Sequence, residues 1–281
     1  MPRALRYTDF RARRRVLVSS DFGYAPGRAP RPTDIIDKAT WKGIVILPDD
    51  VAVRTSNYHG ATLKHLHDLW GAWIESFGNK HDCMFPVMLD AADDFQAATY
   101  NAMTGYYRLS VAALRSALEL TAIGAWAQAC KKQPDFNLWR AGKCEISFGK
   151  TCDGLIGATA VLRQHLYSTI NDGLFDHKSA GTGGGFARRI YGGISEFSHA
   201  RPGHTDGDMR KSNGPIYVRS AFNHVAWIQC EIVGLCFVLL LIARPKQRVP
   251  MAAIELFNNV KRLKSRATRA AFQYLYTTPS A

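Results

Sequence analysis

The sequence lacks the patterns that mark a chain for export. Its six cysteines form no C-x-x-C pair, which in a chain of 281 residues predicts buried free thiols in a reducing compartment. The only apolar run near the basic N-terminus, residues 16–18, is far too short for the core of a signal peptide. We therefore expect a cytoplasmic protein.

Long hydrophobic runs are also scarce. Residues 226–243 are the one membrane candidate, and Gln229 and Glu231 interrupt them. The uninterrupted run from Ile232 to Ala243 is shorter than the roughly 20 residues that a membrane-spanning helix needs. The pattern favours a buried core helix with no membrane partner, and the Glu231 carboxylate then needs hydrogen-bonding partners.

Acidic residues are outnumbered, with 23 Asp and Glu against 36 Lys and Arg, which gives a net charge of +13. This excess favours polyanionic partners such as nucleic acid, nucleotides or an anionic membrane face. A charge that only keeps the protein soluble explains the same excess equally well. With 47% hydrophobic residues, the chain is globular and has enough apolar side chains for a core.

Internal repeats and coiled-coil heptads are absent, but the chain changes character near residue 57. Residues 1–57 hold a basic run at 11–15, a Pro- and Gly-rich segment, and β-like runs at 14–19 and 43–47. They predict a basic N-terminal arm with a small hairpin. Residues 58–281 follow a helical pattern, so we predict a mainly α protein: a helical bundle with an irregular, partly β N-terminal appendage.

Six stretches carry the helical pattern. They are residues 62–77, 91–129, 152–170, 188–199, 220–243 and 250–274. The second is the longest, and its Gly105 and Gly124 either bend the helix or allow another helix to pack closely.

The most polar of these stretches leads into a loop rich in charged residues. Tyr191, Ser195 and His199 recur every four residues and so form one stripe along the predicted helix. The loop after it carries Arg201, His204, Asp206, Asp208 and Asn213. We place the candidate functional site here, with Tyr191, Ser195, Arg201, His204 and Asn213 expected to bind substrate.

A second polar face lies on the predicted helix at 91–129. Arg115 and Glu119 are four residues apart and can form an ion pair. If their side of the helix meets the Tyr191 stripe, a polar pocket forms between two helices, where bundles bind ligands. A surface ion pair is an equally good interpretation.

Patterns for metal or phosphate binding are incomplete. The run GTGGG at 181–185 lacks the following G-K-[ST] and predicts a flexible connection. His65 and His67 point in different directions on a helix and have no further ligands at zinc-like spacing. The His204-x-Asp206-x-Asp208 loop could hold a hard cation, although ordinary turn chemistry explains it better. We expect no metal and no cofactor.

Two segments resemble a known group of proteins. GYYRLSVAALRSALEL at 105–120 and IYGGISEFSHARPG at 190–203 resemble the HEPN-like all-α families of prokaryotic proteins, in which an early helix with Arg and Glu packs on a later helix that ends near a His. The resemblance covers about residues 95–243. It implies a metal-independent ribonuclease or nucleotide-modification module in toxin–antitoxin, antiviral defence or CRISPR-linked systems, which usually works as a dimer.

The family's signature is an Arg followed by four to six residues and then a His. The spacing before His199 is too long, but Arg219 with His224 and Arg54 with His59 both match. A neutral His can take the proton of a ribose 2′-hydroxyl while an Arg stabilises the phosphate. We expect His199, His224, Arg219, Arg115 and Glu119 to be the catalytic residues, and RNA or a nucleotide to be the partner, with a homodimer or a cognate protein as a further one.

Two alternatives remain open. In the first, the protein is a non-catalytic nucleic-acid- or protein-binding helical module, and its binding depends on salt. In the second, His199, His204, Asp206 and Asp208 form a metal-dependent hydrolase.

Overall fold

The computed structural model describes residues 38–78, 80–177, 184–198 and 214–278, in two compact units, 1–46 and 47–281. In the first unit the described residues form a short helix, α2 (Lys38–Trp41), and a π-helical segment, η2 (Lys42–Ile46). The predicted β-like run at 43–47 is therefore wrong, because this segment satisfies its backbone groups within a helix and no described strand pairs with it. The run at 14–19 lies outside the described residues.

The second unit confirms the prediction of a mainly α protein. Its described residues form ten α-helices and no strand. They are α3 (Leu47–Glu75), α4 (Met84–Met103), α5 (Tyr107–Ala129), α6 (Gln133–Arg140), α7 (Phe148–Ala158), α8 (Ala160–Ile170), α9 (Phe186–Ser198), α10 (Arg219–Ala243), α11 (Met251–Asn258) and α12 (Arg266–Thr277). Helix α3 begins before residue 57 and continues past it, with a kink at His59.

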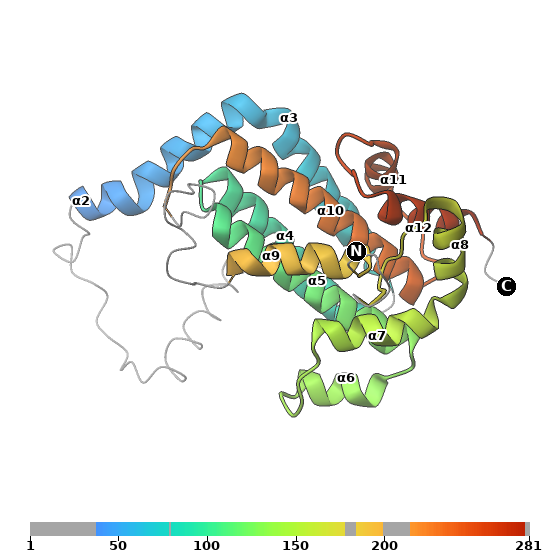
Figure 1. The fold of residues 1–281 in the computed structure, drawn as a ribbon. Coiled ribbons are helices and arrows are strands. Elements are labelled where there is room, and N and C mark those ends of the chain that lie inside the picture. Colours follow the sequence, from blue (N-terminus) through green and yellow to red (C-terminus); the bar gives the residue numbers. More distant parts are fainter. Residues whose placement is uncertain (1–37, 79, 178–183, 199–213, 279–281) are drawn as a thin grey trace, which may run out of the picture. The chain divides into compact units, whose positions relative to one another are not determined.

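Four of these helices form the central bundle. Helix α10 packs against α3, α4 and α5, and α4 also contacts α3 and α5 (Figure 1). Helices α7 and α9 lie on α5, and α12 lies on α10. Helix α5 is therefore shared between the bundle and the α9 helix that carries the predicted polar stripe.

The helix predicted for 91–129 is in fact two helices. Gly105 interrupts it with φ of +87°, and a Cβ at that position would lie 2.6 Å from the backbone nitrogen of Ile216. Glycine is therefore required by both the backbone conformation and the close approach of residues 214–218. The predicted helices at 152–170 and 250–274 are likewise each divided in two, at Thr159 and between α11 and α12.

Gly124 has the second role that the sequence allowed, close packing. It lies on α5 facing α4, where a Cβ would overlap Cγ2 of Val87 and lie 3.1 Å from Sδ of Met84. Val87 is β-branched and buried, so it cannot move aside easily. We expect Gly124→Ala to lower the free energy of unfolding by about 1–3 kcal/mol in chemical denaturation, because it overpacks the α4–α5 contact.

Gly71 provides the matched control. It lies within α3, and a Cβ there would meet no atom within 4 Å. Gly71→Ala should raise the free energy of unfolding by up to about 1 kcal/mol, because alanine favours the helix. Equal effects of the two substitutions would contradict the packing argument.

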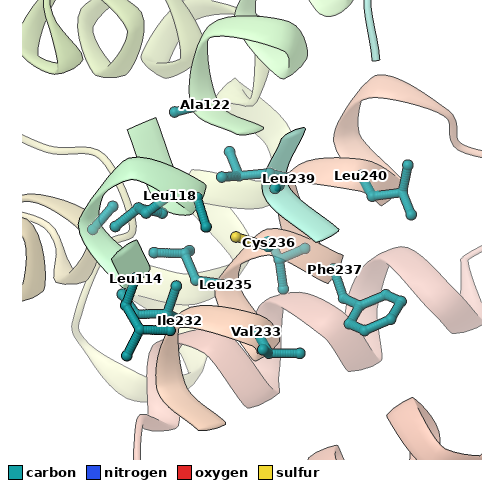
Figure 2. Packing of buried hydrophobic residues seen from close by; sticks show 14 of the residues in the cluster. Leu114, Leu118, Ala122, Ile232, Val233, Leu235, Cys236, Phe237, Leu239 and Leu240 are labelled. Atoms are coloured by element: carbon teal, nitrogen blue, oxygen red, sulfur yellow. The ribbon is translucent and has the colours of Figure 1, made fainter. Parts of the chain in front are cut away.

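Helix α10 forms the core of the bundle. Every residue from 228 to 241 is buried, and Figure 2 shows its apolar side chains packed among Leu114, Leu118 and Ala122 of α5. By length and composition α10 is the one described helix that could span a membrane, but 89% of its apolar window is buried within the protein. The predicted buried core helix is confirmed.

The cysteines are free thiols, as predicted. Four of the six are buried, and burial raises the pKa of Cys152, Cys230 and Cys236 to about 12. These three side chains are therefore protonated and pack as small apolar groups.

Glu231, the carboxylate within α10, has the partners that its burial requires. Its Oε1 accepts hydrogen bonds from Trp227 Nε1 at 2.9 Å and from the backbone nitrogens of Lys264 and Ser265 at 2.6 and 3.2 Å. Burial raises its pKa, while these donors oppose the shift. Glu231 thus fixes residues 264 and 265 of the segment between α11 and α12 to the centre of the protein.

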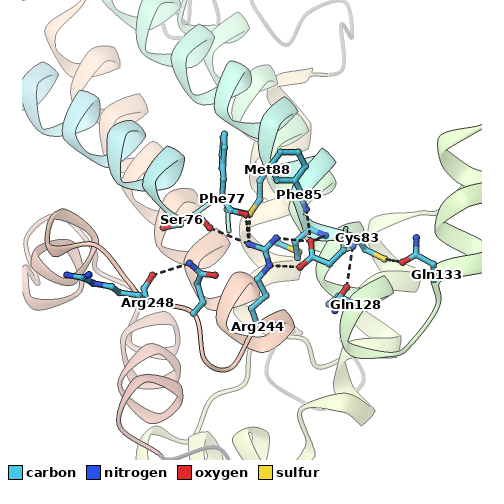
Figure 3. Close-up of polar contacts among 12 residues, drawn as sticks. Ser76, Phe77, Cys83, Phe85, Met88, Gln128, Gln133, Arg244 and Arg248 are labelled. Atoms are coloured by element: carbon cyan, nitrogen blue, oxygen red, sulfur yellow. Dashed lines mark hydrogen bonds and ion pairs between the residues drawn. The ribbon is translucent and has the colours of Figure 1, made fainter. Parts of the chain in front are cut away.

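A buried ion pair ties together the end of α3, the start of α4 and the end of α10 (Figure 3). Arg244, which directly follows α10, donates from Nε and Nη2 to the two carboxylate oxygens of Asp82 at 2.6 and 2.7 Å. Its Nη1 donates to the carbonyl of Phe77, after α3, at 2.8 Å. Asp82 also accepts from the backbone nitrogens of Met84 and Phe85 at the start of α4.

Candidate functional site

Six residues of the predicted site and of its metal-binding alternative lie outside the part of the chain that the structure describes. Nothing is described between 199 and 213, so the structure places none of the following: His199, Arg201, His204, Asp206, Asp208 and Asn213. Their predicted roles stay predictions.

The structure does bring together the predicted residues of α5 and α9. Arg115 Nη2 donates to the Tyr191 hydroxyl at 2.7 Å, and this hydroxyl donates to Glu119 Oε1 at 3.3 Å. Arg115 and Glu119 also form the predicted i,i+4 ion pair, with 3.8 Å between Nη2 and Oε2. The Tyr191 ring stacks on Phe148 of α7, with ring centroids 4.0 Å apart.

In this α5–α9 cluster the two charged side chains and the tyrosine hydroxyl bind one another, and the Arg115 and Glu119 side chains are 29% and 31% exposed. Burial raises the pKa of Tyr191, so its hydroxyl stays protonated and bridges the Arg and the Glu. Ser195 donates to the carbonyl of Tyr191, one turn back in its own helix, at 2.7 Å. The geometry ties α9 to α5, and it gives the tyrosine hydroxyl two charged neighbours.

A second polar cluster lies where α3 kinks. His59 Nε2 and the Tyr217 hydroxyl are hydrogen bonded at 3.1 Å, and the His59 ring lies 4.3 Å from the ring of Phe222. The imidazole is largely enclosed, since His59 is 8% exposed. Burial lowers its pKa, and the positive charge of Arg219 lowers it further. His59 is thus a neutral imidazole at neutral pH, with an Arg nearby.

The backbone around Tyr217 is held by the bundle. The nitrogen of Val218 donates to the hydroxyl of buried Tyr107 at 2.9 Å, and Ile216 lies against Gly105. The Tyr217 ring stacks on Tyr58, with centroids 5.7 Å apart. Tyr58 is 69% exposed, so this end of the cluster opens to solvent.

The two Arg-x4-His matches do not each form a pair. Residues five apart on a helix point about 140° away from one another, and His224 lies beside Trp227, with ring centroids 5.6 Å apart. Arg54 is exposed and pairs with Asp50 at 3.4 Å. What links the two matches is charge: Arg219, from one match, lowers the pKa of His59, from the other.

Sequence reasoning missed this cluster for an identifiable reason. His59 and Tyr217 are 158 residues apart in the chain, and no local spacing links them. The sequence pointed to it only indirectly: one Arg-x4-His match contains His59, and the other contains Arg219. Neither Tyr217 nor Phe222 is a defining residue of any motif that the sequence analysis identified as functional.

No metal centre is formed in the part of the chain that the structure describes. None of its His, Cys, Asp and Glu residues gather in a group of three or more that could hold a metal ion. His65 is largely buried, which with nearby Arg262 lowers its pKa to about 4, and His67 stacks on Trp70. The predicted cation loop at 204–208 lies outside the described residues.

Comparison with protein-family models, with curated proteins and with solved structures finds no match to this chain.

Proposed function

We propose that this protein is a HEPN-like cytoplasmic ribonuclease that acts on RNA without a metal, and that its reaction centre is the His59, Tyr217 and Arg219 cluster. The observation that carries the proposal is the hydrogen bond between a neutral, buried histidine and the hydroxyl of Tyr217, two residues before the exposed Arg219, whose charge lowers the pKa of that histidine. Perturbed histidines with a charged neighbour are typical of sites that transfer protons.

The chemistry runs through Tyr217, because His59 is too enclosed to touch a substrate. The Tyr217 oxygen takes the proton of a ribose 2′-hydroxyl as its own proton passes to His59 Nε2. The 2′-oxygen then attacks phosphorus, and the bond to the 5′-oxygen breaks, with water supplying the proton to that leaving oxygen. Arg219 stabilises the charge that develops on the phosphate. The products are a 2′,3′-cyclic phosphate and a 5′-hydroxyl.

Substitution of the two relay residues tests the proposal. We expect His59→Gln and Tyr217→Phe each to lower the rate of cleavage of a single-stranded RNA by about 10²–10⁴-fold, the usual contribution of a general base. Arg219→Gln should lower it by a similar factor because the phosphate loses its charged partner. Thermal unfolding of each variant, followed by circular dichroism, separates lost chemistry from lost structure.

Arg54→Gln is the matched control, because Arg54 belongs to the other Arg-x4-His match and pairs with Asp50 at the surface. It should keep full activity. Cleavage that survives in His59→Gln and Tyr217→Phe but is lost in His199→Ala or His224→Ala would refute the relay and move the base to the histidine whose substitution abolishes cleavage.

A second candidate is a non-catalytic RNA-binding module. The low exposure of His59 favours it, since a histidine at a helix kink can serve only to hold Tyr217 in place. In this case purified protein binds RNA in a salt-dependent manner and leaves it intact.

A further inference from the structure

Helix α10 exposes one face to solvent only over its first nine residues, Arg219 to Trp227. Between Arg219 and Trp227 the residues that are not buried are Arg219, Ser220, Asn223, His224 and Trp227, and beyond Trp227 only Ile242 is not buried. On a helix these five side chains fall on one side. An otherwise buried core helix thus presents to solvent a short stripe of polar and aromatic side chains that begins at Arg219.

The Trp227 end of this stripe lies against a basic segment. Residues 244–278 hold eight Lys and Arg but a single acidic residue, Glu255. Five of the eight lie in or next to the connection between α11 and α12: Lys261, Arg262, Lys264, Arg266 and Arg269. Lys261, Lys264 and Arg266 are exposed.

The basic segment is fixed in position and joined to the stripe. The Lys264 ammonium lies over the Trp227 ring, 5.2 Å from its centroid, and the Trp227 indole donates to Glu231. Glu231 in turn accepts from the backbone nitrogens of Lys264 and Ser265. A buried carboxylate therefore orients a positively charged segment whose side chains face water, which lowers the entropic cost of binding an anion.

We propose that the stripe on α10 and the basic segment 261–266 form a binding track for a single strand of RNA, which leads from Lys264 past Trp227 and His224 to Arg219. Lysine and arginine along the track contact successive phosphates, and Asn223 supplies a hydrogen-bonding group between them. At the Arg219 end of the track, the exposed Tyr58 ring, which stacks on Tyr217, provides a face on which an unpaired base stacks. This inference rests on the proposed function for the identity of the polymer, and it makes the substrate a polynucleotide, not a mononucleotide.

RNA fits this surface better than an anionic membrane. A membrane-binding surface needs several large apolar side chains beside its positive charges. Between residues 258 and 266 only Val260 is a large apolar side chain with substantial exposure. The track instead combines cations with polar and aromatic groups, as single-strand-binding surfaces do.

Binding of an RNA that cannot be cleaved tests the track. The probe is a fluorescein-labelled 2′-O-methyl RNA of about 20 nucleotides, whose blocked 2′-oxygen prevents reaction, and binding is read from anisotropy over a range of salt concentrations. We expect Lys261→Gln/Lys264→Gln/Arg266→Gln to raise Kd by about 10–100-fold at low salt and to reduce the salt slope by about 2, from three lost phosphate contacts.

The control removes the same charge elsewhere. Lys132→Gln/Arg140→Gln/Lys143→Gln alters three exposed cations around α6 and should bind as the unaltered protein does. Tyr217→Phe should also bind normally, so loss of cleavage without loss of binding tests the reaction centre alone. Equal binding by both triple variants overturns the track, and so does an unaltered protein that binds vesicles containing phosphatidylserine but not the oligonucleotide.

Discussion

Arg244→Met should lower the free energy of unfolding by about 3–5 kcal/mol, a loss of about 10 °C in Tm for a domain of this size. The substitution keeps the apolar stem but removes the guanidinium of a side chain that is 10% exposed, and it leaves the Asp82 side chain, 9% exposed, without its cation. An unpaired buried carboxylate is the costly product. The carbonyls of Ser76 and Phe77, which Arg244 also binds, lose a donor at the same time. Urea denaturation measures the effect.

Two further variants show whether the loss comes from the unpaired charge. Asp82→Asn keeps an oxygen for the backbone nitrogens of Met84 and Phe85, so Asp82→Asn/Arg244→Met should be less destabilised than the sum of its single substitutions. Arg248→Met, at an exposed site nearby, should change stability by less than about 0.5 kcal/mol. Additive losses in the double variant would mean that the ion pair contributes little.

Glu231→Ala should be the other strongly destabilising substitution, with a loss of about 3 kcal/mol. It removes the acceptor of three hydrogen bonds at once, and each buried donor left without a partner costs about 1–3 kcal/mol. Part of this cost is recovered because the segment before α12 can turn its backbone toward water. The same variant should therefore weaken RNA binding, since Lys264 is no longer held over Trp227.

Glu231→Gln separates hydrogen bonding from charge. An amide oxygen can still accept from the indole and from the backbone, so we expect a loss of about 1 kcal/mol and RNA binding close to normal. Glu255→Ala, at an exposed position on α11, is the surface control and should have little effect. If Glu231→Gln is as damaging as Glu231→Ala, the carboxylate acts through its charge and not as an acceptor.

Much of the fold followed from the spacing of apolar residues, because helix formation in a bundle depends chiefly on one apolar face. The α10 core helix and the need for a partner to Glu231 were both predictable on this basis. The break at Gly105 was not, because a glycine within a helical pattern is also compatible with close packing, which is the role of Gly124. The helix at 42–47 was missed because β-branched residues favour strands only where a partner strand exists.

Of the two candidate sites, one could be predicted from the sequence and the other could not. The contact between Arg115, Glu119 and Tyr191 was predictable because helical periodicity placed the residues on faces that could meet. The meeting of His59 with Tyr217 was not, because it depends on how residues 214–218 return to the bundle and rest on Gly105. Spacing along one helix carries no information about such a contact.

The central position of α10 also bears on how the chain acquires its structure during synthesis. Helix α4 ends at residue 103 and α10 at residue 243, so α4 leaves the ribosome roughly 10–30 s before α10 is complete. During that interval α3, α4 and α5 can pack on one another, but the faces that they bury against α10 stay uncovered and the core cannot close. Closure of the four-helix core therefore waits for α10, the last of its helices to be synthesised.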